Sequence, residues 1–368
     1  MFSRRSFLGT TLRSSSLVAL SSTVPDFLSR SARAAKPAGD DRVLVVIELN
    51  GGNDGINTVV PYRDEGYRRH RSATRLATAD LIKIDDQVGL HPSMPDTARP
   101  DNVDAAGSGW IGRALDGRAA TSPSGPGAIF VGAGPSPAAV RGRRSAAIAL
   151  DRTDDFLLGD GAARHPLRHE AADDDELTAF IRRSTLDAYA TADRMAAITR
   201  VAAGRRYPAT RLAGGLEQVS RLIKAGIGAR FYYVIQGGYD THAGQIFTHA
   251  SLLGELSGAI GAFLDDLTTA RLAERVAVLC FSEFGRRVAD NGSNGTDHGT
   301  AGPVFLAGAG VRPGLVGRTP SLTDLEDGDL KVGLDFRRVY AAVLDGWLGL
   351  PAEPALGGAF GTVPLFRA

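Results

Sequence analysis

Residues 42–49 read RVLVVIEL, an almost unbroken run of Val, Leu and Ile. A strand with one solvated face alternates apolar and polar side chains, whereas a strand covered on both faces is apolar throughout. The next six residues, 50–55, read NGGNDG, a composition typical of a tight turn. The run therefore predicts a central strand of a parallel sheet that ends in a glycine-rich loop.

Similar runs recur along the chain and alternate with segments of helical periodicity. Short apolar runs predict further strands at residues 128–131, 146–150, 229–235, 276–281 and 303–307. Apolar residues at helical spacing predict helices at residues 177–201, 209–225, 245–267 and 336–348. This alternation favours an α/β fold with a mostly parallel sheet flanked by helices, a three-layer sandwich in one domain over residues 35–368.

One region interrupts the alternation. Residues 92–127 are rich in Pro, Asp, Gly and Arg and contain no strand-like run. Only residues 110–115 have the spacing of a short helix. A long irregular stretch is unusual inside a compact domain. We therefore expect one short helix here within an otherwise irregular connection.

The chain begins with the pattern of an export signal. Arg4 and Arg5 precede a weakly apolar stretch, and residues 32–34, ARA, provide a small-x-small cleavage site. We predict that residues 1–34 are a signal peptide for the twin-arginine export machinery, which makes the mature protein periplasmic or secreted. The apolar stretch is too short to span a membrane, so we expect no integral span in the mature form. The alternative is a disordered basic tail.

Composition excludes several classes of partner and chemistry. The formal net charge is +1, with no long basic run, so we expect no nucleic acid partner. Cys280 is the single cysteine, so neither an intramolecular disulfide nor a thiolate zinc cluster can form. Any metal chemistry must therefore use Asp, Glu and His.

Carboxylates and imidazoles follow the predicted strands. In an open α/β sheet, the loops at the carboxyl ends of the strands converge and form ligand sites. The candidate metal ligands in these loops are Asp54, Asp240, His242, Glu283, Asp297 and His298. In the absence of thiolates, these side chains favour Zn, Mn or Fe. Six ligands exceed what one ion needs, so we expect room for two divalent metals about 3.5–4 Å apart, an arrangement that hydrolyses esters.

Three further residues complete the candidate site. Arg286, beside Glu283, could hold a small anionic ester through charge-assisted hydrogen bonds, and Asn53 is a second candidate for substrate binding. His249, early in a predicted helix, is an additional candidate ligand. Each candidate has an alternative interpretation: an aspartate in such a loop can cap a helix or stabilise a turn, and Arg286 can lie at a solvated helix start.

Four motifs in this chain resemble a bacterial family. They are LNGGNDG at residues 49–55, GGYDTH at 237–242, SEFGR at 282–286 and GTDHGTAG at 295–302. They resemble the family catalogued as domain of unknown function 1501, which is similar in fold to the alkaline phosphatase and sulfatase superfamily. The resemblance implies metals at the strand ends, held by the six candidate ligands in chain order, and hydrolysis of phosphate or sulfate esters. It assigns no substrate.

The chain departs from the family pattern after Met94. In the family a helix, a further strand and a serine-containing turn follow the Leu-His-Pro motif, whereas here residues 95–102, PDTARPDN, follow directly. The hydroxyl nucleophile of the superfamily usually lies in that segment. The sequence therefore identifies no catalytic residue.

Two functions remain open from the sequence. The first is an exported metal-dependent hydrolase of phosphate or sulfate esters. The second is an exported metal-binding protein that lacks the nucleophile segment and does not turn over substrate. A deletion that leaves a poorly folding chain is a third alternative.

Overall fold

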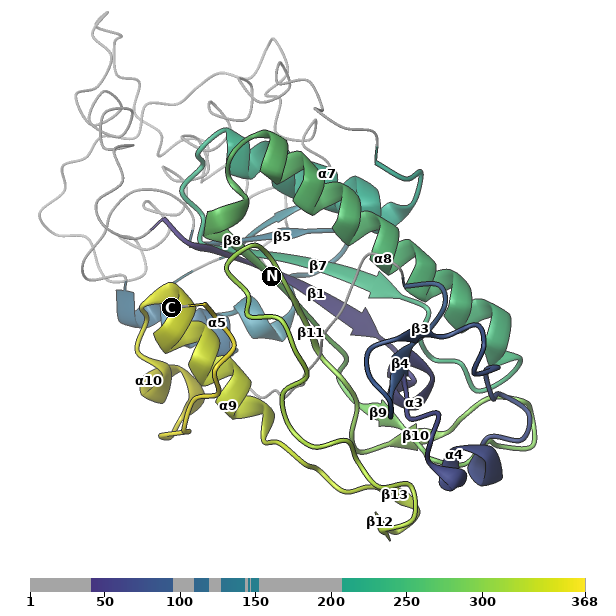
Figure 1. Ribbon diagram of the computed structural model, residues 1–368. Helices are drawn as coiled ribbons and strands as arrows, with labels where there is room; N and C mark the ends of the chain where they lie inside the picture. Colours follow the sequence, from purple (N-terminus) through teal and green to yellow (C-terminus); the bar gives the residue numbers. More distant parts are fainter. Residues whose placement is uncertain are drawn as a thin grey trace, which may run out of the picture.

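The computed structural model describes residues 41–94, 109–118, 127–142, 145, 147–151 and 207–367. Its centre is a six-stranded sheet with helices on both faces (Figure 1). The predicted signal peptide and the predicted helix at residues 177–201 lie outside the described residues. Within the described ranges, no helix is long and apolar enough to cross a membrane.

The central sheet contains every strand that the apolar runs predict. In spatial order its strands are β11 (Phe305–Ala307), β8 (Val276–Phe281), β1 (Val43–Asn50), β7 (Phe231–Gly237), β5 (Ala128–Val131) and β6 (Ala147–Leu150). β1 pairs in parallel with β7 and β8, so that Val46 lies opposite Tyr233 on one side and Leu279 on the other. Only β11 runs antiparallel, at the edge of the sheet against β8. The predicted mostly parallel sheet is confirmed.

Strand β1 packs against helices on both sides. Val45 and Ile47 belong to one buried cluster with α7 (Arg211–Lys224) and α8 (Gln245–Thr269). Leu44 and Val46 belong to a second cluster on the other face. Successive side chains of a strand point to opposite faces, so an unbroken apolar run fills two cores at once.

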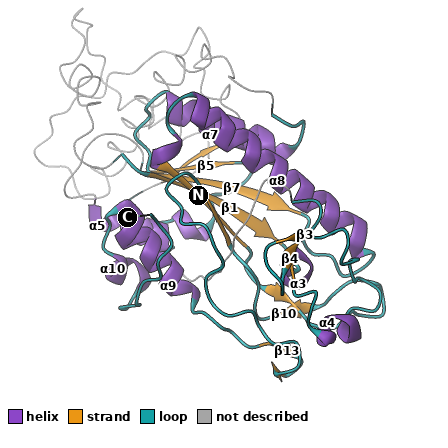
Figure 2. Ribbon diagram, viewed as in Figure 1, coloured by secondary structure: helices purple, strands orange, loops and turns teal. Residues whose placement is uncertain are grey.

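The second face is covered by the segment after residue 109 and by the C-terminal helices, as Figure 2 shows. These elements are α5 (Trp110–Arg118), α9 (Phe336–Ala341), a π-helix (Ala342–Leu348) and α10 (Ala352–Leu356). The short helix expected near residue 110 is therefore present, and its Trp110 stacks on Tyr340 of α9. The predicted helix at 336–348 is found over that range, but its second half has π geometry, and Trp347 Nε1 donates to the Val43 carbonyl at 3.0 Å. The three-layer sandwich is confirmed.

Short elements gather beyond the carboxyl ends of the parallel strands (Figure 1). They are α3 (Gly55–Thr58), β2 (Val59–Val60), α4 (Glu65–His70), β3 (Ile82–Lys83), β4 (Gly89–Leu90), β9 (Gly285–Arg286), β10 (His298–Gly299), β12 (Leu325–Glu326) and β13 (Asp329–Leu330). Two single 3-10 turns, Ala138–Val140 and Ala273–Arg275, lie elsewhere. The loops that carry the candidate ligands therefore share one end of the sheet.

Candidate metal centre

Three of the predicted ligands form one cluster, which we call the exposed triad: Asp240, His242 and His298. One donor atom from each lies within 4.8 Å of the other two. Asp240 Oδ1 is 3.2 Å from His242 Nε2 and 3.0 Å from His298 Nε2. The three side chains are 60%, 45% and 53% exposed, in that order, so a dissolved ligand can reach them. The hydrogen bond from His298, followed by that from Arg286, lowers the pKa of Asp240, which keeps it an anionic ligand.

The local backbone explains why two distant histidines meet. His242 lies just beyond β7, whereas His298 lies in β10, which pairs antiparallel with β9 so that His298 is opposite Arg286. The ring of Phe284 contacts the His298 ring, with centroids 4.2 Å apart. The small β9–β10 ribbon thus carries His298 back to the end of the sheet where Asp240 lies.

Asp297 contacts the triad through His242 and is itself 59% exposed. Its Oδ1 lies 3.2 Å from His242 Nδ1 and accepts a hydrogen bond from Asn291 Nδ2 at 3.0 Å. The bond from Asn291 and then the contact with His242 lower the pKa of Asp297. A carboxylate on Nδ1 fixes the imidazole tautomer that leaves Nε2 for a metal. Asp297, expected as a direct ligand, is therefore placed to orient His242.

Arg286, expected at the substrate, is instead 1% exposed and fastens the loops of the site. Its guanidinium donates to four backbone carbonyls, those of Gly51, Gly52, Tyr239 and Thr296. The same group donates to Asp240 Oδ1 at 2.7 Å. Three strand-end loops and one carboxylate are thus held by one side chain, which leaves the guanidinium no exposed face for a substrate anion.

Asp54 is fully buried and does not join the exposed triad. Its carboxylate forms a two-pronged ion pair with Arg71, in which Arg71 Nη2 lies 2.9 Å from Oδ1, and it also accepts from Gln245 Nε2. It caps α3 by accepting from Asn57 N. Burial alone would raise the pKa of Asp54, but the charge and hydrogen bond of Arg71, with smaller contributions from His249 and Gln245, together lower it. The alternative of a capping aspartate therefore describes its contacts.

Asn53 and His249 lie behind the site in a buried polar cluster. His249 Nε2 is 2.9 Å from Asn53 Oδ1, which also accepts from Thr58 Oγ1 at 3.0 Å. Burial lowers the pKa of His249 to about 4, so its imidazole is neutral near pH 7. His91 is buried alongside, with ring centroids 5.8 Å apart. The Nδ2 amide of Asn53 has no hydrogen-bond partner among the described residues.

Glu283 holds the turn after β1. Its Oε1 accepts from Gly51 N at 3.1 Å and from Asn50 Nδ2 at 2.8 Å. Burial, with a smaller contribution from Glu48, raises the pKa of Glu283 even though backbone hydrogen bonds oppose the change. The Glu283 carboxylate thus binds the Gly51 amide of the loop after β1, whose Gly51 and Gly52 carbonyls accept hydrogen bonds from Arg286.

The glycines of residues 50–55 permit this close packing. Gly51 has φ +114°, and a Cβ there would lie 2.4 Å from the Asp240 backbone nitrogen. Gly52 has φ +78°, and a Cβ there would lie 2.2 Å from the Phe284 ring. Both positions combine a left-handed backbone with contact that only glycine allows.

Sequence reasoning missed two residues that organise the site. Arg71 neutralises Asp54 but lies in the basic stretch RRHR, residues 68–71, which carries no signal of burial. Gln245 donates to Asp54 and accepts from Thr241 Oγ1 and Thr296 Oγ1. It links the buried Asp54 to both halves of the exposed site, and nothing in its sequence context indicated that role.

The exposed triad fits a divalent cation by the chemistry of its donors. One carboxylate and two imidazoles are a donor set that Zn, Mn and Fe accept, and protein metal sites of three ligands leave positions open for water or substrate. Cys280 is buried in β8 and offers no sulfur ligand. The arrangement supports one such ion, because Asp54 is occupied by Arg71.

Comparison with known proteins places the chain in a family. No curated protein matches it. It is similar to the lipoteichoic acid synthase LtaP from Listeria monocytogenes, at 7% identity and a TM-score of 0.29, covering 76% of this chain and 71% of that one. It is also similar to the PsFucS1 sulfatase from Pseudoalteromonas sp., at 10% identity and a TM-score of 0.27, covering 77% and 66%. Likeness this remote carries no argument about activity.

The family model that matches this chain covers residues 82–355, which include five of the six strands of the central sheet (β5, β6, β7, β8 and β11), the exposed triad and Asp297. It begins after β1 and after Asp54. The resemblance that the four motifs indicated is confirmed: the chain belongs to the family described as protein of unknown function (DUF1501).

Proposed function

We propose that this protein is a metal-dependent hydrolase of phosphate or sulfate esters, in which the exposed triad holds one divalent cation of the Zn, Mn or Fe type. The observation that carries the proposal is the convergence of Asp240 and His242, from the loop after β7, with His298, from β10, onto one half-exposed point. Exposed acidic groups alone are common on proteins. Two imidazoles whose nitrogens face one carboxylate oxygen are a more specific arrangement.

The surrounding residues prepare the triad for this role. Asp297 orients His242 through its contact with Nδ1, and the buried Arg286 fixes the position of Asp240 by donating to its Oδ1. A bound cation would supply an ionised water near neutral pH and polarise an ester oxygen. Because the cation would offset the negative charge of Asp240, the site would accept an anionic ester.

A second candidate function is metal binding without turnover, and the hydroxyl groups beside the triad favour it. Thr241 and Thr296 are the threonines next to His242 and Asp297 in the chain, and both are buried with their hydroxyls donated to Gln245 Oε1. Neither of these two threonines could therefore act as the nucleophile, and the hydrolase proposal depends on water activated by the cation.

We also infer export through the twin-arginine pathway. This pathway carries proteins that have already folded, so a cation acquired in the cytoplasm would be exported with the protein. The support for export is the paired arginines and the cleavage site in residues 1–34.

The test is elemental analysis of purified protein together with hydrolysis of p-nitrophenyl phosphate and p-nitrophenyl sulfate. We expect about one divalent metal per chain, strongly reduced in His242→Ala and Asp240→Asn. His70→Ala is the matched control, because His70 is a histidine outside the triad and its substitution should leave the metal content unchanged. Wild-type protein without metal after dialysis against Zn, Mn and Fe would refute the proposal. Bound metal without hydrolysis of either ester would favour the second candidate.

A further inference from the structure

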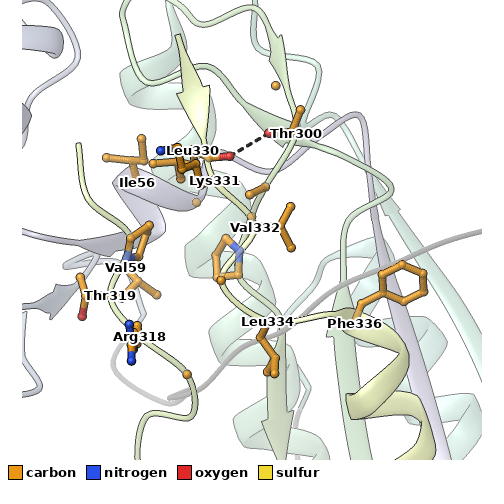
Figure 3. Close-up of a pocket in the computed structure, with 18 of the residues that line it drawn as sticks. Ile56, Val59, Thr300, Arg318, Thr319, Leu330, Lys331, Val332, Leu334 and Phe336 are labelled. Carbon is orange, nitrogen blue, oxygen red and sulfur yellow. Dashed lines mark hydrogen bonds between the residues drawn. The ribbon is translucent and has the colours of Figure 1, made fainter. Parts of the chain in front are cut away.

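A cavity of about 590 Å³, drawn in Figure 3, is lined in part by Phe284 and Gly299, which neighbour His298 of the exposed triad. One wall comes from α3 and β2, which contribute Ile56 and Val59, and another from residues 315–322 and 330–337. Its volume lies in the range of about 300–1,000 Å³ that is usual for pockets binding small molecules. We call it the apolar cavity, because Val, Leu, Ile, Pro and Phe side chains predominate in its lining.

The walls of the apolar cavity are tied to the rest of the fold. Thr300 Oγ1 donates to the Leu330 carbonyl at 3.0 Å, the bond drawn in Figure 3. Leu322 N donates to Asp64 Oδ2 at 3.3 Å. These bonds join both lining segments to the loops at the end of the sheet, so the cavity is formed before a ligand enters it.

The rim of the apolar cavity exposes apolar surface to water. Val332 is 66% exposed and Leu315 is 37% exposed, and they are two of the three large apolar side chains with such exposure in the part of the chain that the structure describes. The third, Phe247, lies elsewhere, on α8. Isolated exposed apolar residues need no explanation, but two on the rim of one apolar cavity mark a surface that a ligand covers.

The cavity lining carries charged side chains of both signs. Lys331 and Arg337 line it but pair with Asp324 and Asp335. Arg318 also lines it and has no ion pair with any residue in the described ranges. Glu283 also lines the cavity and offsets this charge formally, but the Arg318 guanidinium can still donate hydrogen bonds to an anionic group.

The apolar cavity and the exposed triad share a wall. Phe284 lines the cavity, and its ring contacts the His298 ring at 4.2 Å between centroids. Gly299, the residue after His298, lines it as well. A molecule that contacts Phe284 inside the cavity would therefore have one end separated from His298 by the Phe284 ring.

The geometry points to an amphiphilic substrate: the apolar cavity binds the hydrophobic alkyl or aryl body of an anionic ester whose charged head lies toward the exposed triad. This inference rests on the proposed function for the identity of the head group. The cavity supplies the preference for the body, because burial of each methylene contributes about 0.8 kcal/mol.

Calorimetric titration of the chelator-treated full chain tests this inference without metal or turnover. The probes are n-decylphosphonate, kept below its micellar concentration, and ethylphosphonate. We expect decylphosphonate to bind at least tenfold more tightly. Val332→Glu and Leu315→Glu should each weaken decylphosphonate binding at least tenfold, because each places a carboxylate on the apolar rim. Phe247→Glu is the matched control, since it changes an 86% exposed apolar residue away from the cavity and should have no effect.

Equal binding of the two phosphonates, or unchanged binding in both rim variants, would overturn the inference. These outcomes are separable from failure of the proposed function. Metal binding and hydrolysis of short esters with no dependence on chain length would refute only the cavity assignment. Chain-length-dependent binding to a protein that takes up no metal would support the cavity and refute only the proposed hydrolase.

Discussion

The contrast between Asp54 and Asp240 yields the most direct test of the site. Both aspartates follow a parallel strand, and the sequence predicts both as metal ligands. In the structure Asp54 and Arg71 are each 0% exposed, whereas the Asp240 side chain is 60% exposed. Asp54→Asn should therefore destabilise the fold in the absence of metal by more than Asp240→Asn does.

The magnitude follows from burial. Removing one partner of a buried ion pair costs about 3–5 kcal/mol, because it leaves an uncompensated charge inside the protein. Arg71 keeps hydrogen bonds to the carbonyls of Val288 at 2.6 Å and Arg287 at 3.0 Å, so we expect Asp54→Asn to lie near the lower end, at about 3 kcal/mol. Asp240→Asn also removes the carboxylate partner of a buried guanidinium, that of Arg286, but the Asp240 side chain is 60% exposed and Arg286 keeps four carbonyl acceptors, so we expect a smaller loss than for Asp54→Asn.

The assay is urea unfolding at pH 7 with a chelator present, which separates fold stability from metal binding. A double variant, Asp54→Asn with Arg71→Met, should be more stable than Asp54→Asn alone, because it removes the stranded charge. The pKa of Asp54 is lowered in the fold, so the stability from this pair is present above about pH 3.8 and is lost as pH falls through the lowered pKa. If Asp54→Asn retained wild-type stability in chelator but lost its metal, Asp54 would be a ligand and our assignment would fail.

Three further predictions address the rest of the site. Asp297→Asn should weaken metal affinity about 10–100-fold, measured by competition with a chromophoric chelator, while its urea midpoint stays unchanged, because it orients His242 without supporting the fold. Gly51→Ala should lower both stability and metal affinity, because its added Cβ would lie 2.4 Å from the Asp240 backbone nitrogen. Gly237→Ala is the control, because nothing lies within 4 Å of its added Cβ. Equal urea midpoints for the two variants would contradict the prediction. His249 is neutral in the fold with a pKa of about 4 and titrates near 6.5 when unfolded, so stability should decline as pH falls from 6.5 to 4; a His249→Gln variant that declines as steeply as wild type would count against this.

Local pattern was sufficient to predict the central sheet. The apolar runs at residues 128–131 and 276–281 became β5 and β8 with unchanged bounds. A strand buried on both faces needs apolar side chains at every position, and this requirement is readable without tertiary information. The π geometry after Ala341 was not readable, because apolar spacing does not distinguish a π-helix from an α-helix.

The candidate site was predicted in composition but not in arrangement. The sequence predicted that candidate ligands would be Asp, Glu and His and that they would follow strands sharing one end of the sheet, since parallel strands place their carboxyl ends together. It could not distinguish Asp240 from Asp54, because the difference depends on Arg71, which the chain brings to Asp54 from 17 residues away. Tertiary structure alone decided which carboxylates are paired inside the protein and which lie exposed at its surface. Burial and charge pairing depend on contacts between separate segments, whereas strand formation depends on neighbouring residues.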